Sequence, residues 1–213
     1  MTMVDEDWRV RWAKGRTGWH EPEGNAGLQE SWPALTDNQR VLVPLCGKSP
    51  DLLWLARRGH DVSGVELSEI AIRDFFTDND IEFHMTNAGV LDRYAAVAWP
   101  LTLYCGDYFE FAESGFDALY DRGALVALPP DLRSRYVVHT KSLLRAGASK
   151  MIITLEYDQE AVNGPPFSVP AAEVCSYWDD LICVSKKDDI DNCPPKFRAA
   201  GLTDVKELVW SSM

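Results

Sequence analysis

Short apolar runs alternate with longer amphipathic stretches through the centre of this chain. Several runs are rich in β-branched or aromatic residues and are bounded by turn residues, which is typical of buried strands. We predict strands at residues 40–45, 60–67, 101–105, 116–120, 150–157, 182–184 and 205–210. Helical patterns lie between them, at residues 51–58, 69–79, 132–145 and 171–181, and residues 5–32 combine helix with loop.

Local signals place the ends of two of these helices. Ser68 is a candidate N-cap for the helix at 69–79, whose residues Ile70, Phe75 and Phe76 are expected to face inward. Gly147 is expected to stop the helix at 132–145.

The alternation of strands and helices predicts an α/β fold. A doubly wound, mostly parallel seven-stranded sheet with helices on both faces accounts for the order of the elements. The length of 213 residues suits a single domain over residues 1–213. In such sheets ligands bind beyond the carboxyl ends of the strands, so candidate site residues are sought there.

Composition restricts the classes of partner. The 33 acidic and 21 basic residues give a net charge of −12, which disfavours nucleic acid and anionic membrane surfaces. No stretch approaches the roughly 18 apolar residues of a membrane span. Residues 1–7 carry three acidic side chains and no apolar run, unlike a signal peptide.

Cysteine and histidine usage points to a reducing compartment and to no metal site. The five cysteines are odd in number and contain no Cys-x-x-Cys pair, which is typical of free thiols in the cytoplasm. The four histidines are scattered, without the spacing of a metal site.

Two of the strand ends carry the elements of a nucleoside site. Gly47 follows the first strand, where glycine lets the backbone approach a ligand closely. Glu66 ends the second strand, nineteen positions later, where a carboxylate can accept hydrogen bonds from both ribose hydroxyls. A tight turn at Gly47 and a helix-capping role for Glu66 are the structural alternatives.

Two more strand ends add polar groups. Asp107 and Tyr108 follow the third strand, where an acid can accept from an adenine amino group and a ring can pack on the base. Arg122 follows the fourth strand and could clamp a carboxylate. The alternatives are a turn aspartate and an Asp121–Arg122 surface pair.

Three sequence blocks resemble the thiopurine S-methyltransferase family, which has the class I methyltransferase fold. They are RVLVPLCGKSPDLLWLARRGHDVSGVELSE, DRGALVALPP and GPPFSVP, and the spacing from Trp12–Trp19 to the first block also fits. The resemblance implies S-adenosyl-L-methionine as cofactor and S-adenosyl-L-homocysteine as product. It also implies that residues 1–35 form an N-terminal helical lid.

The resemblance also assigns roles to individual residues. The implied cofactor-binding residues are Trp8, Trp12, Trp19, Leu45, Gly47, Glu66, Leu67, Asp107, Tyr108 and Arg122. Trp19 would also face the methyl acceptor, together with Arg122 and Lys196. Lys196 lies in NCPPKF, which departs from the pattern of the mammalian members.

The implied activity is methyl transfer to a soft nucleophile. The acceptor would be the sulfur of thiopurines or aromatic thiols, or a selenium or tellurium compound. Such a displacement depends on holding donor and acceptor in line, so no catalytic acid–base residue is expected and Arg122 is expected to orient a reactant. The expected protein is a cytoplasmic monomer whose partners are small molecules.

Three other functions stay open at this point. A halide or thiocyanate methyltransferase would share the cofactor. An NAD-dependent oxidoreductase would also use Glu66, although the three spaced glycines of the dinucleotide motif are absent. A cofactor-binding module without catalysis would have the same crevice.

Overall fold

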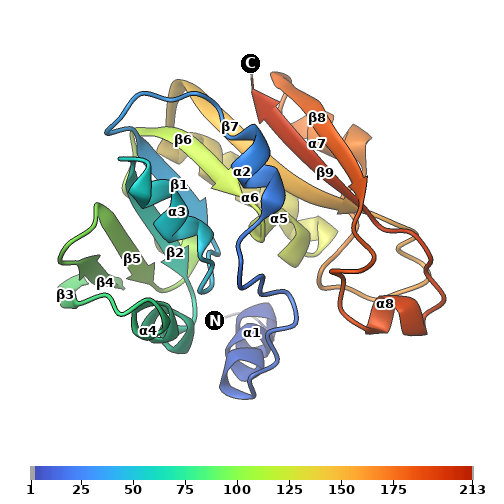
Figure 1. Ribbon diagram of the computed structural model, residues 1–213, viewed down its shortest axis with the longest axis horizontal. Coiled ribbons are helices and arrows are strands. Elements are labelled where there is room, and N and C mark those ends of the chain that lie inside the picture. The colour runs from blue at the N-terminus through green and yellow to red at the C-terminus, as the bar shows by residue number, and fades with distance from the viewer. Residues whose placement is uncertain (1–2, 213) are drawn as a thin grey trace.

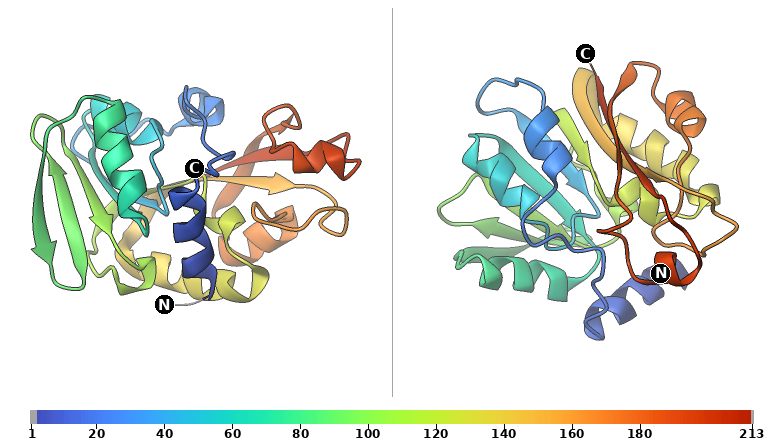
Figure 2. Two further views of the ribbon diagram at one scale, coloured as in Figure 1. Left: turned by 90° about the horizontal axis from the view of Figure 1, so that it is seen from below. Right: turned by 45° about the vertical axis from the view of Figure 1, so that its right-hand side comes forward.

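Nine strands lie side by side in one mixed sheet, with helices on both sides (Figures 1 and 2). This arrangement is seen in a computed structural model, which describes residues 3–212. Met1, Thr2 and Met213 belong to the predicted domain range and lie outside the described residues.

The helices and strands follow one another in alternation through most of the chain. The helices are α1 (Met3–Ala13), α2 (Ala26–Ser31), α3 (Asp51–Arg57), α4 (Glu69–Asp78), α5 (Ala124–Ala127), α6 (Pro130–Leu143), α7 (Ala171–Tyr177) and α8 (Lys196–Ala199), with a 3-10 turn at Tyr108–Glu110. The strands are β1 (Arg40–Pro44), β2 (Asp61–Glu66), β3 (Phe83–Ala88), β4 (Leu91–Ala96), β5 (Leu101–Cys105), β6 (Phe116–Asp121), β7 (Leu144–Glu156), β8 (Leu181–Asp188) and β9 (Lys206–Ser212).

The strand order confirms the doubly wound topology. The sheet runs β3-β4-β5-β2-β1-β6-β7-β9-β8, and its five central strands, β5 to β7, are parallel. The outer strands pair antiparallel. The chain winds from β1 toward one edge and then returns to place β6 on the other side of β1. The crevice of such a sheet opens at that reversal, beyond β1 and β6.

The predicted number of seven strands is wrong, because the hairpin of β3 and β4 was missed. β3 forms one edge of the sheet and is exposed along almost its whole length, so it has no alternation of apolar and polar residues. β4 buries Leu91 and Tyr94, which lie three positions apart and give no strand-like period.

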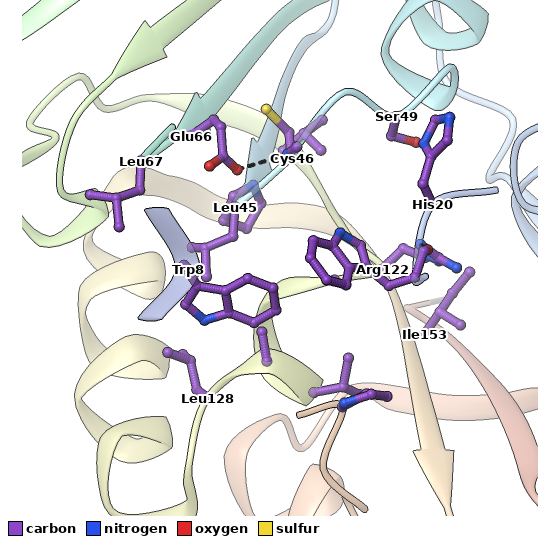
Figure 3. A pocket seen from close by; sticks show the side chains of 18 of the residues that line it. Trp8, His20, Leu45, Cys46, Ser49, Glu66, Leu67, Arg122, Leu128 and Ile153 are labelled. Carbon is purple, nitrogen blue, oxygen red and sulfur yellow. Dashed lines mark hydrogen bonds between the residues drawn. The ribbon is translucent and has the colours of Figure 1, made fainter. Parts of the chain in front are cut away.

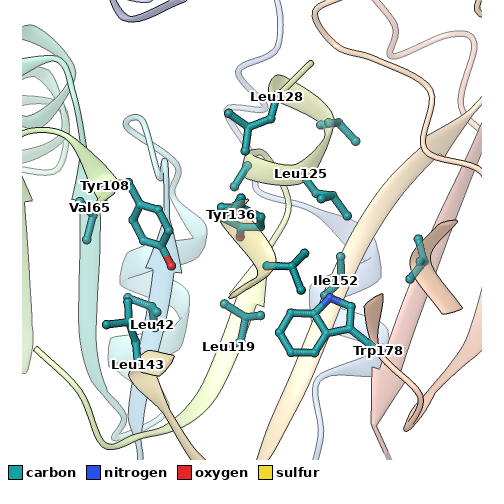
Figure 4. Packing of buried hydrophobic residues seen from close by; sticks show 14 of the residues in the cluster. Leu42, Val65, Tyr108, Leu119, Leu125, Leu128, Tyr136, Leu143, Ile152 and Trp178 are labelled. Atoms are coloured by element: carbon teal, nitrogen blue, oxygen red, sulfur yellow. The ribbon is translucent and has the colours of Figure 1, made fainter. Parts of the chain in front are cut away.

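Each face of the sheet carries its own apolar core. One core packs α2, α3 and α4 on the sheet. The other packs α5, α6 and α7 on the opposite face, where Leu125, Tyr136 and Trp178 meet Ile152 of β7 (Figure 4). Burial on both faces explains why the central strands are continuous apolar runs.

Two helix-end predictions need correction. Ser68 occupies the N-cap position of α4, but its side chain makes no capping hydrogen bond, and Ile70 is 45% exposed. The buried face of α4 is Ala71, Ile72, Phe75 and Phe76. Helix α6 ends at Leu143, and Gly147 lies within β7.

Asp121, the last residue of β6, fixes the turn that leads into α5. Its Oδ1 accepts hydrogen bonds from the backbone N–H groups of Ala124 (3.0 Å) and Leu125 (3.2 Å), and its Oδ2 accepts one from the Tyr136 hydroxyl (2.7 Å). The carboxyl group is fully buried. Burial raises its pKa to about 6, against the opposing effect of these hydrogen bonds.

This pKa predicts a pH dependence of stability. Between the ordinary aspartate pKa and about pH 6, the folded state binds more protons at Asp121 than the unfolded state does. The contribution of Asp121 to the free energy of unfolding therefore falls as the pH rises through this window. On lowering the pH from 7 to 4.5, the wild type should gain about 2 kcal/mol of unfolding free energy relative to Asp121→Asn. Urea unfolding of both proteins measures this, with exposed Asp131→Asn as the control; parallel pH profiles for wild type and Asp121→Asn would contradict it.

Candidate functional site

The carboxyl ends of four neighbouring parallel strands enclose one pocket, which the N-terminal segment and residues 192–194 complete. Ten of the eleven predicted site residues line it (Figure 3). They are Trp8, Trp12, Trp19, Leu45, Gly47, Glu66, Leu67, Asp107, Tyr108 and Arg122. Residues that are scattered along the sequence therefore meet in one crevice, as the topology requires.

The loop after β1 has a left-handed backbone at two positions. Leu45 has φ 48° and Gly47 has φ 55°. A Cβ atom on Gly47 would lie 3.2 Å from the Trp12 ring, so Gly47 is needed for both its conformation and its lack of a side chain. The loop thus lies directly against the tryptophan of α1.

Glu66 joins this loop to the end of β2. Its Oε2 accepts a hydrogen bond from the Gly47 N–H (2.9 Å), and its Oε1 accepts one from the Ser68 N–H (2.8 Å). The residue is 6% exposed, and burial raises the pKa of the carboxyl group. Each carboxylate oxygen can accept a second hydrogen bond, so the group fits the paired hydroxyls of a ribose.

The turn after β5 provides an acceptor and an apolar wall. The Asp107 Oδ1 accepts from the Phe109 N–H (2.9 Å), while its Oδ2 accepts no hydrogen bond from any described residue. The hydroxyl of buried Tyr108 is paired with Thr140 Oγ1 (2.9 Å), so the side chain offers the pocket its ring. This combination suits the amino edge and the face of an adenine.

Three tryptophans cover the crevice from the N-terminal segment. Helix α1 lies beyond the carboxyl ends of the central strands (Figure 1). The Trp19 ring packs edge-on against Trp8, with centroids 4.9 Å apart, and against Trp12, with centroids 5.7 Å apart. Their contact brings residues from the helix and from the following loop into one aromatic wall.

Arg122 holds the N-terminal segment in place. Its guanidinium donates to the Trp19 carbonyl oxygen (2.8 Å) and forms an ion pair with Glu21. The alternative of an Asp121–Arg122 surface pair is wrong, because Asp121 is buried and bonded to α5 and Tyr136.

Lys196 is the predicted site residue that the structure places elsewhere. It does not line the pocket, and its Nζ donates to the carbonyl oxygens of Asn163 (2.6 Å) and Pro165 (2.8 Å). Both hydrogen bonds tie α8 to the Gly-Pro-Pro loop. The structure therefore gives Lys196 a contact that holds a loop and does not bring it to the pocket with the other ten predicted residues.

Sequence reasoning missed other lining residues, above all His20, Glu21, Asp51 and Glu207. Asp51 accepts hydrogen bonds from the Asn25 N–H (2.9 Å) and the Tyr120 hydroxyl (2.7 Å). Glu207 accepts from the Asn25 Nδ2 (2.9 Å). These residues do not come directly after a strand of the parallel core, so the strand ends did not indicate them. The position of His20 next to Trp19 in the sequence was the available signal.

Other features of the chain bear on the type of site. Among the side chains that the structure describes, no group of three or more histidine, cysteine, aspartate or glutamate residues could hold a metal ion. All five cysteines are free. Among the described helices, none is long and apolar enough to cross a bilayer.

Comparison with known sequences matches nearly the whole chain to one family. The family model of thiopurine S-methyltransferase matches residues 3–212. Relatives named thiopurine S-methyltransferase include proteins of Pseudomonas fluorescens strain SBW25, 47% identical, and strain Pf0-1, 43% identical, both over 217 residues. A Photobacterium profundum relative of the same name is 41% identical over 211 residues. Each alignment covers 98% of both proteins.

Comparison with solved structures supports the fold. A Burkholderia thailandensis 1,6-didemethyltoxoflavin-N1-methyltransferase, solved with its acceptor and S-adenosylhomocysteine, has a TM-score of 0.65 at 18% identity and covers 99% of this chain and 87% of its own. An Anabaena variabilis S-adenosylmethionine-dependent methyltransferase has a TM-score of 0.64 at 13% identity, covering 100% and 96%.

The Glu66 geometry predicts a loss of cofactor affinity in Glu66→Gln. A glutamine has one acceptor oxygen, so it cannot serve both the Gly47 and Ser68 amides and a ribose diol. We expect the Kd for S-adenosylhomocysteine to rise about 10- to 100-fold, from the loss of a charged hydrogen bond worth about 1.5–3 kcal/mol. Calorimetry measures it, and Glu69→Gln, on the exposed side of α4, is the matched control. A folded Glu66→Gln protein with wild-type affinity would contradict the role.

Proposed function

The chain belongs to the thiopurine S-methyltransferase family, and we propose that it methylates the sulfur of neutral aromatic thiols, thiopurines among them. It is an S-adenosylmethionine-dependent methyltransferase, and S-adenosylmethionine is its cofactor. The side chains that line the pocket support this class of acceptor.

The acceptor end of the pocket lies opposite the residues that suit the adenosine. Figure 3 shows Glu66 and Leu67 at one end and His20, Ser49 and Arg122 at the other. Aromatic and aliphatic side chains also line the pocket, among them Trp8, Trp12, Trp19, Phe109 and Ile153. A flat apolar ring fits such walls by stacking and edge contacts.

The observation that carries the proposal is the charge of this lining. Among the described residues, five acidic side chains and two basic ones line the pocket: Glu21, Asp51, Glu66, Asp107 and Glu207 against Lys48 and Arg122. Both cations are already paired, Lys48 with Asp74 and Asp78 and Arg122 with Glu21. An anion such as selenite or iodide would have to displace a carboxylate from its partner, whereas a neutral thiol meets no such cost.

The residues divide the work of binding and orientation. Bound S-adenosylmethionine supplies an activated methyl group with a good leaving group. Glu66 and Asp107 are placed to hold the ribose and the adenine, and the tryptophans exclude water from the acceptor end. Arg122 orients this end by fixing Trp19 and Glu21. Positioning of this kind accounts for large rate enhancements in displacement reactions.

We extend the proposal to the N-terminal segment, residues 1–35, as a lid within a single methyltransferase domain. It is supported by the ties of this segment to the strand ends through Arg122 and Asp51. The monomeric state and the cytoplasmic location stay predictions.

An acceptor panel tests this function. With S-adenosylmethionine at about pH 6, where both thiols are mainly neutral, 6-mercaptopurine and thiophenol should be methylated with a kcat/KM at least about tenfold above that for selenite, tellurite, iodide or thiocyanate, the ratio that about 1.4 kcal/mol of unfavourable pairing produces. Glu21→Gln releases Arg122 from its carboxylate partner, so Arg122 can pair with an anionic acceptor. The ratio of kcat/KM for the thiols to kcat/KM for the anions should therefore fall. Faster turnover of an inorganic anion by the wild type would overturn the choice of acceptor, and no methylation of any acceptor would overturn the activity.

A further inference from the structure

His20 lies at the acceptor end of the pocket. It follows Trp19 in the loop between α1 and α2 and lines the pocket beside Ser49, away from Glu66 (Figure 3). Its backbone N–H donates to the Thr17 carbonyl oxygen (2.9 Å), which fixes the turn that presents the side chain. The imidazole is therefore held where an acceptor would enter.

The ring of His20 has no hydrogen-bonding partner among the described residues and is uncharged at neutral pH. None of the hydrogen bonds and ion pairs made by the described residues involves its ring nitrogens. Burial lowers its pKa below the ordinary value, and Lys48 and Arg122 lower it further, against the opposing charges of Asp78 and Asp51. A neutral imidazole has one nitrogen that can accept a proton.

Other titratable groups of the pocket are less suited to take a proton. Both oxygens of Asp51 accept hydrogen bonds, and Glu21 is paired with Arg122. Burial raises the pKa of the Cys193 thiol to about 12, so it is itself protonated at neutral pH. Glu207, whose pKa is also raised by burial, keeps one oxygen free and is the competitor to His20.

A base matters because the proposed acceptors enter as thiols. A thiol like that of cysteine has a pKa of about 8.5, and only a few per cent of it is ionised at pH 7, so a base matters most for acceptors whose thiol is no more acidic than this. Methyl transfer to sulfur releases this proton, and the apolar walls of the pocket disfavour its direct loss to water.

We propose that His20 is the general base of the reaction and takes the S–H proton of the acceptor. The freed electron pair of the acceptor sulfur forms the new bond to the methyl carbon. The bond between that carbon and the sulfonium sulfur breaks, and its electron pair stays on the cofactor sulfur, giving S-adenosylhomocysteine. The imidazolium then releases the proton to solvent. This inference rests on the proposed function, since it requires a thiol acceptor.

The test compares His20→Gln with the wild type on two acceptors at pH 7. Benzyl mercaptan is almost wholly protonated there, whereas 4-nitrothiophenol is almost wholly ionised. The kcat for benzyl mercaptan should fall about 100-fold in His20→Gln, the usual contribution of general base catalysis, while the kcat for 4-nitrothiophenol stays within about threefold of wild type. Dividing the kcat of His20→Gln by the wild-type kcat for the same acceptor removes differences in binding between the two acceptors.

Three variants make the comparison specific. His84→Gln changes a histidine that is exposed on β3, far along the chain from the pocket, and should leave both rates unchanged. Free imidazole should restore benzyl mercaptan turnover in His20→Ala. Equal losses on both acceptors, or no loss on either, would overturn the role of His20, and a selective loss in Glu207→Gln instead would assign it to Glu207. A wild type that methylates neither thiol would overturn the proposed function itself.

A readout without turnover completes the test. The chain has four histidines, so the His20 imidazole resonances can be assigned by their loss in His20→Gln. In the free protein they should titrate below the ordinary histidine pKa of about 6.5. Titration at or above that value would overturn the proposal, because it would leave the ring protonated over much of the neutral range.

Discussion

The two hydrogen bonds that Glu66 accepts from backbone amides decide the shape of the cofactor end. One amide belongs to the loop after β1 and the other to the first residues after β2, so a single buried carboxylate fixes both loops relative to each other. Burial alone would favour a protonated carboxyl, and the amides oppose this by favouring the charge. The same side chain is thus a structural tie and, in the proposed function, the binding group for a ribose. Gly47, which donates one of these amides, also lies so close to the Trp12 ring that it has no space for a side chain.

A second set of charged side chains fastens the N-terminal segment to the sheet. Arg122 at the end of β6 binds Trp19 and Glu21, and Asp51 at the start of α3 binds Asn25. Removing one partner from such a pair leaves an unpaired charge, which costs more than the pair contributes. The tryptophan wall is therefore held through the same groups that give the acceptor end its charge. Substrate preference and closure of the crevice are linked through Arg122.

The sequence predicted the central sheet and most of the site because both obey simple periodic rules. β1, β2, β5 and β6 are buried on both faces, so they appear as apolar runs, and their carboxyl ends carry Glu66 and Arg122. The edge strand β3 escaped prediction, since exposure removed the pattern. His20 escaped because its position depends on a loop folding back over the sheet. Lys196 was misplaced for a related reason: its carbonyl partners are 31 and 33 residues away in sequence.

The charge of the acceptor end has a consequence for the order of events in the reaction. A pocket whose two lining cations are already paired favours an acceptor that enters without charge, yet the nucleophile that attacks the methyl group is better when charged. Both requirements are met only if the acceptor binds as a neutral thiol and loses its proton within the pocket. A neutral imidazole can take the thiol proton inside the pocket, and Asp78 and Asp51 favour the resulting cation against the opposing charges of Lys48 and Arg122. Asp51, one of the carboxylates that disfavour anionic substrates, therefore also favours the imidazolium that forms when a neutral acceptor reacts, and so opposes the effects of burial, Lys48 and Arg122.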